Sequence, residues 1–291
     1  MRNLSDIQEV KRILSRHGFH FSKSLGQNFL IDPEVCPRMA EESGITKDMG
    51  VIEVGPGFGV LTQQLALRAG KVVAIEVDKR LPEVLADTLS DFDNVTVYNA
   101  DVMELDLNEL IAREFPGMDV VVCANLPYYI TSPVIMKLLE EKLPIRSLVV
   151  MVQKEAAVRI CAQPGQRECG AVSVAVQYYA EPEILFAVGR DSFFPAPKVD
   201  SAVMKLDVRS APPAVLDGVE EKRFFQVVHA AFSQRRKTVS NSLSSGLSLG
   251  KEQVRKALSS AGIPENFRAE QLTLAQFGKL CQELNRQEAE K

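Results

Sequence analysis

The chain has 291 residues, of which 46% are hydrophobic, and a formal net charge of −4. This length buries a large core, and no apolar run approaches the roughly 18 residues that span a bilayer, so we expect one large and one smaller domain without a membrane segment. The first twenty residues lack the apolar core of a secretory signal, which predicts a cytoplasmic protein, and the negative net charge confines any nucleic-acid contact to local basic patches.

The predicted elements begin with a helix that Ser5 caps and that runs to about Arg16, with Gly18 as its stop. A loop over residues 20–32 follows. From Val51 onward, short β-branched runs alternate with helical stretches, which is typical of β-α-β units around a parallel sheet. The expected strands are Val51–Val54, Val72–Val77, Val95–Tyr98, Val120–Cys123 and Ser147–Val152. The expected helices between them are Leu61–Arg68, Pro82–Leu89, Glu104–Glu114 and Pro133–Glu141.

The pattern changes in the last third of the chain. After a helix over Ala171–Tyr179, we expect Glu183–Val188 and Ser201–Val208 to form an antiparallel strand pair at the edge of the sheet. Beyond about residue 210 the sequence predicts only helices, over Glu220–Ser233, Lys251–Ser260 and Thr273–Gln287. The sequence therefore predicts a domain over residues 1–209 and a small helical domain over residues 210–291.

A glycine-rich turn, Glu53-Val-Gly55-Pro-Gly57-Phe-Gly59, follows the first strand of the predicted sheet and opens a helix. Glycines there allow a ligand to approach the backbone N–H groups at the helix N-terminus. The dinucleotide fingerprint G-x-G-x-x-G would require glycine at position 60, where Val60 stands. The spacing therefore disfavours an NAD enzyme.

Acidic residues end the next two predicted strands. Glu76 lies 21 residues after Gly55, where an acid accepts both ribose hydroxyls of a nucleoside. Asp101 ends the third strand and is placed to accept an adenine amino group. A solvated surface position for Glu76 and a helix cap for Asp101 are the alternatives. The carboxyl ends of parallel strands meet at one edge of an open α/β sheet, so we expect these residues to share a ligand site.

Asn125-Leu126-Pro127-Tyr128 follow the strand Val120–Cys123 and form a loop suited to an exocyclic amino group. The lone pair of adenine N6 is delocalised into the ring, so the nitrogen attacks an electrophile only when acceptors hold it toward sp3 geometry. The Asn125 side-chain oxygen and the Leu126 carbonyl would each accept one N–H, Pro127 would stiffen the loop and Tyr128 would stack on the base. Four such residues occur by chance in many proteins, so the motif gains weight only beside the ligand site that the glycine turn, Glu76 and Asp101 predict.

Together these residues resemble the bacterial ribosomal RNA adenine dimethylases, a family of S-adenosylmethionine-dependent methyltransferases. The resemblance covers residues 20–240 and rests on five segments in chain order: Lys23-Ser-Leu-Gly-Gln-Asn-Phe-Leu30, Glu53-Val-Gly-Pro-Gly-Phe-Gly59, Asn125-Leu-Pro-Tyr128, Phe193-Phe-Pro-Ala-Pro-Lys-Val-Asp-Ser201 and Ala231-Phe-Ser-Gln-Arg-Arg-Lys237. Tyr129 stands where many relatives have Asn.

The resemblance implies a doubly wound, Rossmann-like α/β sheet with a small C-terminal helical domain. It implies S-adenosylmethionine as the cofactor, and the expected cofactor-binding residues are Asn28, Leu30, Gly55, Gly57, Glu76, Asp101 and Asn125. It also implies the substrate: two adjacent adenosines in the 3′-terminal hairpin of 16S rRNA, within a partly assembled 30S particle, converted to N6,N6-dimethyladenosine by a monomeric enzyme.

Two further groups of residues are assigned to the target. Phe193 and Phe194 would lie across from Tyr128 and sandwich an extruded adenine, with one ring stacking and the other in the core. Arg235, Arg236 and Lys237 follow a helix whose C-terminal dipole alone would explain them, but the resemblance favours contact with RNA backbone. Lys23, Arg146, Lys154, Arg159 and Arg167 are further candidates for that surface.

Other classes remain open at this stage. A dimethylase of large-subunit (23S) rRNA would share the cofactor half, and a ribosome-assembly factor could keep the fold and bind without depending on catalysis. The five cysteines are scattered without a C-x-x-C pair, and the three histidines lack ligand spacing. The sequence therefore predicts no disulfide framework and no metal site.

Overall fold

The computed structural model describes residues 2–18 and 28–289. The chain divides into two compact units, a sheet unit (Met1–Ala157 and Glu181–Val208) and a helical unit (Val158–Ala180 and Arg209–Lys291). The division after Val208 lies next to the predicted boundary, but residues 158–180 group with the helical unit. That segment carries Tyr178, whose ring lies 5.1 Å from that of Phe224 and 5.0 Å from that of Phe225. The functions assigned to the two parts of the chain stay predictions.

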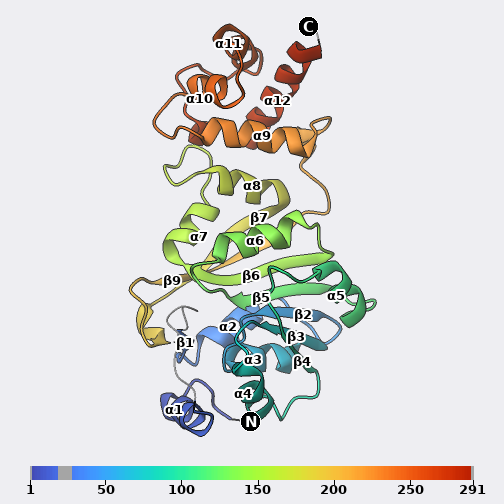
Figure 1. The fold of residues 1–291 in the computed structure, drawn as a ribbon, viewed down its shortest axis with the longest axis vertical. Helices are drawn as coiled ribbons and strands as arrows, with labels where there is room; N and C mark the ends of the chain where they lie inside the picture. The colour runs from blue at the N-terminus through green and yellow to red at the C-terminus, as the bar shows by residue number, and fades with distance from the viewer. Residues whose placement is uncertain (1, 19–27, 290–291) are drawn as a thin grey trace. The chain divides into compact units, whose positions relative to one another are not determined.

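The sheet unit is built on a seven-stranded sheet in the order β4-β3-β2-β5-β6-β9-β7 (Figure 1). The strands are β2 (Gly50–Val54), β3 (Lys71–Glu76), β4 (Val95–Asn99), β5 (Val120–Asn125), β6 (Ile145–Gln153), β7 (Ala180–Val188) and β9 (Ser201–Val208). The strands β2 to β6 pair in parallel, β9 is antiparallel to β6, and β7 lies beside β9 at the edge. The predicted doubly wound α/β fold is confirmed.

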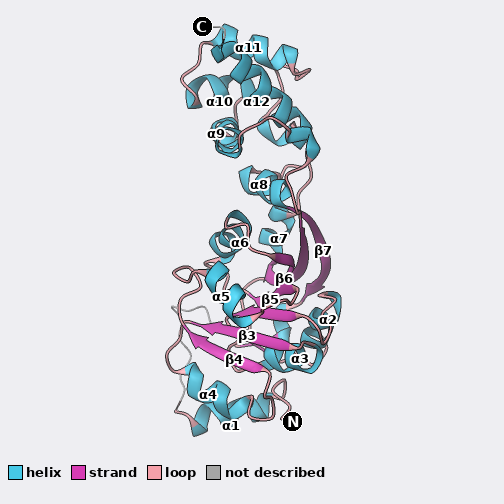
Figure 2. Cartoon of the chain, turned by 90° about the vertical axis from the view of Figure 1, so that its right-hand side faces the viewer, coloured by secondary structure: helices cyan, strands magenta, loops and turns pink. Residues whose placement is uncertain are grey.

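Helices cover both faces of this sheet. They are α2 (Val35–Glu42), α3 (Val60–Arg68), α4 (Leu81–Thr88), α5 (Leu107–Glu114), α6 (Thr131–Glu140) and α7 (Lys154–Ile160). Figure 2 shows α2 and α3 on one face and α5 and α6 on the other. The central strands are apolar and buried along their length, as expected for a sheet covered on both sides. Strand order reverses between β2 and β5, and this switch point is where open α/β sheets bind ligands.

The N-terminal helix α1 (Ile7–Arg16) begins one residue later than predicted. Its cap is Asp6, not Ser5, because the Asp6 carboxylate accepts a hydrogen bond from the Gln8 backbone N–H at 2.9 Å. A second anchor is Asp87, whose carboxylate lies 2.8 Å from the Arg2 guanidinium and 3.0 Å from that of Arg16. The N-terminal segment is therefore attached to the main sheet domain at both of its ends.

A small second sheet replaces part of two predicted loops. Strand β1 (Phe29–Leu30) pairs antiparallel with β8 (Phe193–Phe194), with Phe29 opposite Phe194 and Leu30 opposite Phe193. Residues 20–27 of the predicted loop lie outside the described residues. A pairing between segments so far apart leaves no periodic signal in two residues of sequence, which is why these segments read as loops.

The helical unit contains α8 (Ala171–Tyr179), α9 (Glu221–Phe232), α10 (Val239–Gly246), α11 (Lys251–Ser260) and α12 (Leu274–Ala289), with short 3-10 turns at Ala214–Leu216 and Ala269–Gln271. A further 3-10 turn, Arg190–Ser192, lies in the sheet unit. The helix α10 was not predicted, because its serines and asparagine are poor helix formers. Val239 and Leu243 are fully buried, and a Cβ at Gly246 would lie 2.8 Å from that of Ala230 on α9. Close packing on α9 therefore stabilises this helix.

None of the helices in the described part of the chain is both long and apolar enough to cross a membrane.

Candidate active site

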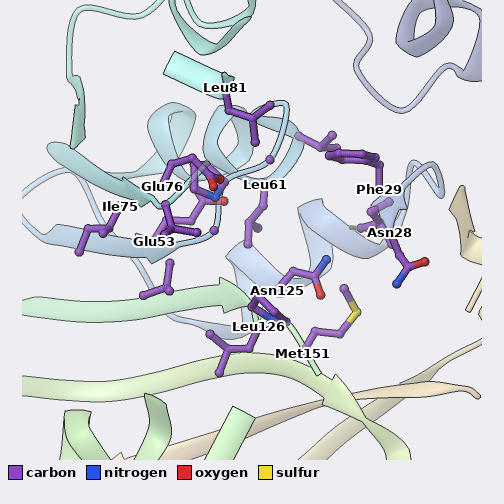
Figure 3. Close-up of a pocket in the computed structure, with 18 of the residues that line it drawn as sticks. Asn28, Phe29, Glu53, Leu61, Ile75, Glu76, Leu81, Asn125, Leu126 and Met151 are labelled. Carbon is purple, nitrogen blue, oxygen red and sulfur yellow. The ribbon is translucent and has the colours of Figure 1, made fainter. Parts of the chain in front are cut away.

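An open cavity lies at the carboxyl ends of β2, β3 and β5, at the switch point of the sheet (Figure 3). Its open space is about 1140 Å³ with the solvent at its mouth included, which leaves room for a nucleoside-sized ligand. Most of the predicted site residues line it: Asn28, Leu30, Gly55, Gly57, Glu76, Asp101, Asn125, Leu126, Pro127, Tyr128 and Phe193. Segments spread over more than 160 residues of sequence therefore meet in one pocket.

The glycine turn has a backbone that residues with a side chain rarely adopt. The φ angles of Gly55, Gly57 and Gly59 are +71°, +59° and +90°. A Cβ at Gly57 would lie 3.2 Å from the ring of Phe29, which stacks on Phe58 with ring centroids 3.9 Å apart. The glycines therefore let the backbone turn sharply at the cavity wall, and the stacked rings of Phe29 and Phe58 lie against this turn.

Two buried carboxylates lie side by side in the wall of the cavity. Glu76 at the end of β3 is 5% exposed, and its Oε1 accepts a hydrogen bond from the Asp78 backbone N–H at 2.8 Å. Glu53 in β2 is 1% exposed, and its Oε2 has no hydrogen-bond partner among the described residues. Burial raises the pKa of Glu76. Burial also raises the pKa of Glu53 to about 8; the Thr62 hydroxyl opposes this rise and the nearby charge of Glu76 adds to it.

Glu53 is part of the glycine motif, but no role of its own is predicted for it from the sequence. The sequence does contain a signal for one, because a glutamate inside the strand Val51-Ile-Glu53-Val54 interrupts an apolar run that is buried on both faces. A buried acid with an oxygen that has no partner among the described residues marks a place where a ligand donor or cation fits.

Asp101 is one of the residues that line the cavity, and its Oδ1 accepts a hydrogen bond from the Met103 backbone N–H at 2.9 Å. The alternative, a helix cap, is wrong, because residues 102–104 form a turn and the next helix, α5, begins at Leu107 with Asp106 as its cap. The role of Asp101 toward an adenine amino group stays a prediction.

The loop after β5 carries the predicted target-binding residues. The Leu126 N–H donates to the Met151 carbonyl at 3.0 Å, and the Ile130 N–H donates to the Pro127 carbonyl at 3.2 Å, so the backbone is held on both sides. In Figure 3 the Asn125 amide extends into the cavity from the side opposite Glu53 and Glu76. The Asn125 amide and the carboxylic acids of Glu53 and Glu76 therefore belong to one cavity.

The structure separates the two phenylalanines that the sequence left undecided. Phe193 is 3% exposed, belongs to the core cluster and lines the cavity. Phe194 is half-buried, is not among the residues that line this cavity, and lies with its ring centroid 5.9 Å from the Lys11 ammonium. Of the described residues, Tyr128, Tyr129, Phe29, Phe58 and Phe193 are the aromatic side chains in the cavity wall.

The basic segment lies in the helical unit, in the turn after α9. Arg235, Arg236 and Lys237 are all exposed. Arg235 is already engaged, because its Nη2 donates to the Arg167 carbonyl at 2.8 Å. This contact brings the loop around Arg167 beside the basic segment, so four basic side chains gather on one unit. Arg235 has a structural role in addition to any contact with a ligand.

No group of three or more His, Cys, Asp and Glu side chains in the described ranges could hold a metal ion.

The strand order, the cavity at the switch point and the Asn-Leu-Pro-Tyr loop define a doubly wound methyltransferase. The profile of the family described as "Ribosomal RNA adenine dimethylase" matches residues 18–286. The "Ribosomal RNA small subunit methyltransferase A" of Geobacillus thermodenitrificans is 52% identical over 94% of both chains, and its namesake from Alkaliphilus oremlandii is 47% identical over 98% of this chain and 99% of its own.

Solved structures show the same relationship. A dimethyladenosine transferase from Plasmodium falciparum has a TM-score of 0.72 at 25% identity and covers 89% of this chain and 98% of its own. The 23S rRNA methyltransferase ErmE has a TM-score of 0.69 at 30% identity and covers 89% of this chain and 100% of its own. The chain belongs to the ribosomal RNA adenine dimethylase family, which confirms the family predicted from the sequence motifs.

Proposed function

We propose that this enzyme transfers methyl groups from S-adenosylmethionine to N6 of two adjacent adenosines in the 3′-terminal hairpin of 16S rRNA, during assembly of the 30S subunit. The observation that carries the proposal is the position of the Asn125 amide and its loop, across one cavity from Glu53 and Glu76. The names of the small-subunit relatives support the choice of RNA.

The cavity wall suits S-adenosylmethionine, which supplies an electrophilic methyl group on a sulfonium when it is bound. Gly55 and Gly57 would approach the cofactor through their backbone, and Asn28 and Leu30 would contribute from β1 and the residue before it. Glu76 would accept the ribose hydroxyls and Asp101 the adenine amino group. The unpaired oxygen of Glu53 supports a cationic ligand in particular, because a positive charge nearby stabilises a buried carboxylate.

The target adenine would enter beside the loop after β5. Asn125 accepts one N–H of the exocyclic amine through its side-chain oxygen, and the Leu126 carbonyl accepts the other. Together they hold the nitrogen with its lone pair directed at the methyl group. Tyr128 stacks on one face of the base, and Phe193 is the aromatic residue we assign to the other side.

The helical unit is proposed to bind the rRNA. Arg236 and Lys237 are the basic residues we assign to the phosphates, while Arg235 orients the segment through the Arg167 carbonyl. A protein of net charge −4 gains little from diffuse attraction, so a shaped, partly assembled 30S particle is the expected partner. We expect the enzyme to act as a monomer in the cytoplasm, where such particles assemble.

Two alternative functions that the sequence left open can be compared with this proposal. A large-subunit dimethylase is represented by ErmE at 30% identity, whereas the small-subunit relatives reach 52% and 47%. A binding factor without catalytic activity would have no need of an acceptor loop beside a nucleoside cavity. Both observations favour the small-subunit methyltransferase.

The test is a methylation assay on unmodified 30S particles with labelled S-adenosylmethionine, read by primer extension and mass spectrometry of the rRNA. The expected product is N6,N6-dimethyladenosine at two neighbouring positions of the 3′-terminal hairpin. Asn125→Ala should lower the rate by about 100- to 1000-fold, as loss of a transition-state contact does, with cofactor affinity within a few-fold. Asn108→Ala, a change of an exposed asparagine on α5, is the matched control.

Two further arms separate the alternatives. Label in large-subunit RNA would reject the small-subunit assignment, and full activity of Asn125→Ala would reject the proposed chemistry. Replacement of Arg236 and Lys237 by Ala should weaken binding to the particle and flatten its salt dependence, because fewer counterions are released, without change in cofactor affinity.

A further inference from the structure

The hydroxyl groups of Tyr128 and Ser201 lie 2.7 Å apart in the sheet unit. Tyr128 belongs to the loop after β5, and Ser201 is the first residue of β9, so the contact joins two motifs that are 73 positions apart in the chain. The Ser201 side chain is fully buried, whereas the Tyr128 ring is half-buried and lines the cavity. A residue outside the cavity wall thus contacts a residue inside it.

Ser201 stands on a rigid support. It lies opposite Gln153 in the antiparallel β6–β9 pair, which continues to Asp207 opposite Ser147. The residue before β9 is also fixed, because the Lys154 N–H donates to the Asp200 carbonyl at 3.0 Å. The position of the serine hydroxyl is therefore set by the sheet and does not depend on the cavity.

The Tyr128 ring needs such a support. The backbone of its loop is held by the Leu126 and Ile130 N–H groups, but these contacts leave the two side-chain torsions of Tyr128 free. The hydroxyl is the atom of the ring farthest from the backbone and lies on the axis of the second torsion, so a hydrogen bond there restricts the first torsion and with it the position of the ring. Burial raises the pKa of Tyr128, which keeps the phenol protonated and able to donate or accept.

We infer that Ser201 is a positioning residue of the target-base pocket, which holds Tyr128 in the rotamer that places its ring against the incoming adenine. The inference rests on the proposed function, because it takes Tyr128 as the stacking residue. Without the serine hydroxyl the ring samples other rotamers, and the base is bound less often in the reactive orientation. A hydrogen bond of ordinary net strength changes such a population by about two- to tenfold.

The experiment is a double-mutant cycle on methyl transfer to unmodified 30S particles. Ser201→Ala and Tyr128→Phe should each lower kcat/KM by about two- to tenfold, and the double variant should be no worse than either single variant. The affinity for S-adenosylmethionine should stay unchanged in all three. Ser147→Ala is the matched control, since it removes another buried serine hydroxyl from the same sheet and should leave activity unchanged.

An NMR resonance from the Tyr128 ring gives a second readout, which Ser201→Ala would not change if the serine only stabilised the fold. The chain has five tyrosines, so fluorotyrosine labelling yields few resonances, and Tyr128→Phe identifies the one from Tyr128. Ser201→Ala should shift or broaden that resonance and leave the others in place. If Ser201→Ala fails to fold, Tyr128→Phe still tests the bond from the cavity side.

The outcomes separate this inference from the proposed function. Wild-type activity in Tyr128→Ala would reject stacking by Tyr128 and the inference with it. An inactive Tyr128→Ala beside wild-type activity in both Ser201→Ala and Tyr128→Phe would overturn the inference alone. Effects of the two single variants that multiply in the double variant would also overturn it, because they would then act independently.

Discussion

Carboxylates in two regions of the sheet unit have opposite surroundings. Glu114 at the end of α5 accepts hydrogen bonds from Lys71, Tyr98 and Arg113, at 2.8, 2.6 and 3.0 Å, and the Lys71 contact is the main cause that lowers its pKa to about 2. At the ligand edge, Glu53 and Glu76 are more deeply buried, and no basic side chain among the described residues pairs with them. Burial raises the pKa of both.

The contrast separates a carboxylate that is paired within the fold from two that are buried beside the cavity without a basic partner among the described residues. A paired carboxylate lowers the free energy of the folded protein, while a buried unpaired one raises it and persists where binding compensates. Three predictions test this contrast.

The largest expected effect is on cofactor binding. Glu76→Ala should weaken the affinity for S-adenosylmethionine at least tenfold, because hydrogen bonds from ribose hydroxyls to a carboxylate are worth roughly 1.5–3 kcal/mol each. Calorimetry measures the affinity directly. Glu83→Ala removes an exposed glutamate from α4 and serves as the control. Equal affinity in wild type and Glu76→Ala would remove Glu76 from the cofactor site.

The next effect is on the pH dependence of stability in the empty protein. The pKa of Glu53 rises on folding from 4.5 to about 8, so the folded state binds more protons than the unfolded state between these values. Stability should therefore fall as pH rises through this window. Glu53→Gln should remove that slope and stabilise the empty protein by about 1–3 kcal/mol above the window, as judged from urea unfolding. An unchanged slope in the variant would mean that Glu53 is not the titrating group.

The smallest expected effect is that of Glu114 on stability, and its pH dependence has the opposite sign to that of Glu53. The pKa of Glu114 falls on folding from 4.5 to about 2, so its contribution is present above 4.5 and is lost as pH falls through about 2. Glu114→Gln should cost about 1 kcal/mol at neutral pH and reduce the acid sensitivity of unfolding. Cofactor affinity should not change. A loss of cofactor binding in Glu114→Gln would contradict the division between a carboxylate that stabilises the fold and carboxylates that bind the ligand.

The fold class and most of the pocket could be predicted because their signals are local. Alternating β-branched and helical segments imply a parallel sheet, and strand ends of a parallel sheet share one edge, so Gly55, Glu76, Asp101 and Asn125 were placed together from position alone. The glycine spacing works the same way, since the conformational freedom it supplies is a property of each residue. Here each step depends on a few neighbouring residues.

Tertiary structure decided what depends on partners distant in the chain. The β1–β8 pairing brings Phe193 to the cavity, and the packing of Val239 and Leu243 makes a helix of a serine-rich segment with weak helix propensity. The unpaired oxygen of Glu53 and the contact between Tyr128 and Ser201 likewise exist only once strands are assembled. Periodicity and spacing record what a residue does within its own element. Which residue stands opposite it depends on register and packing, and no single segment of sequence carries that information.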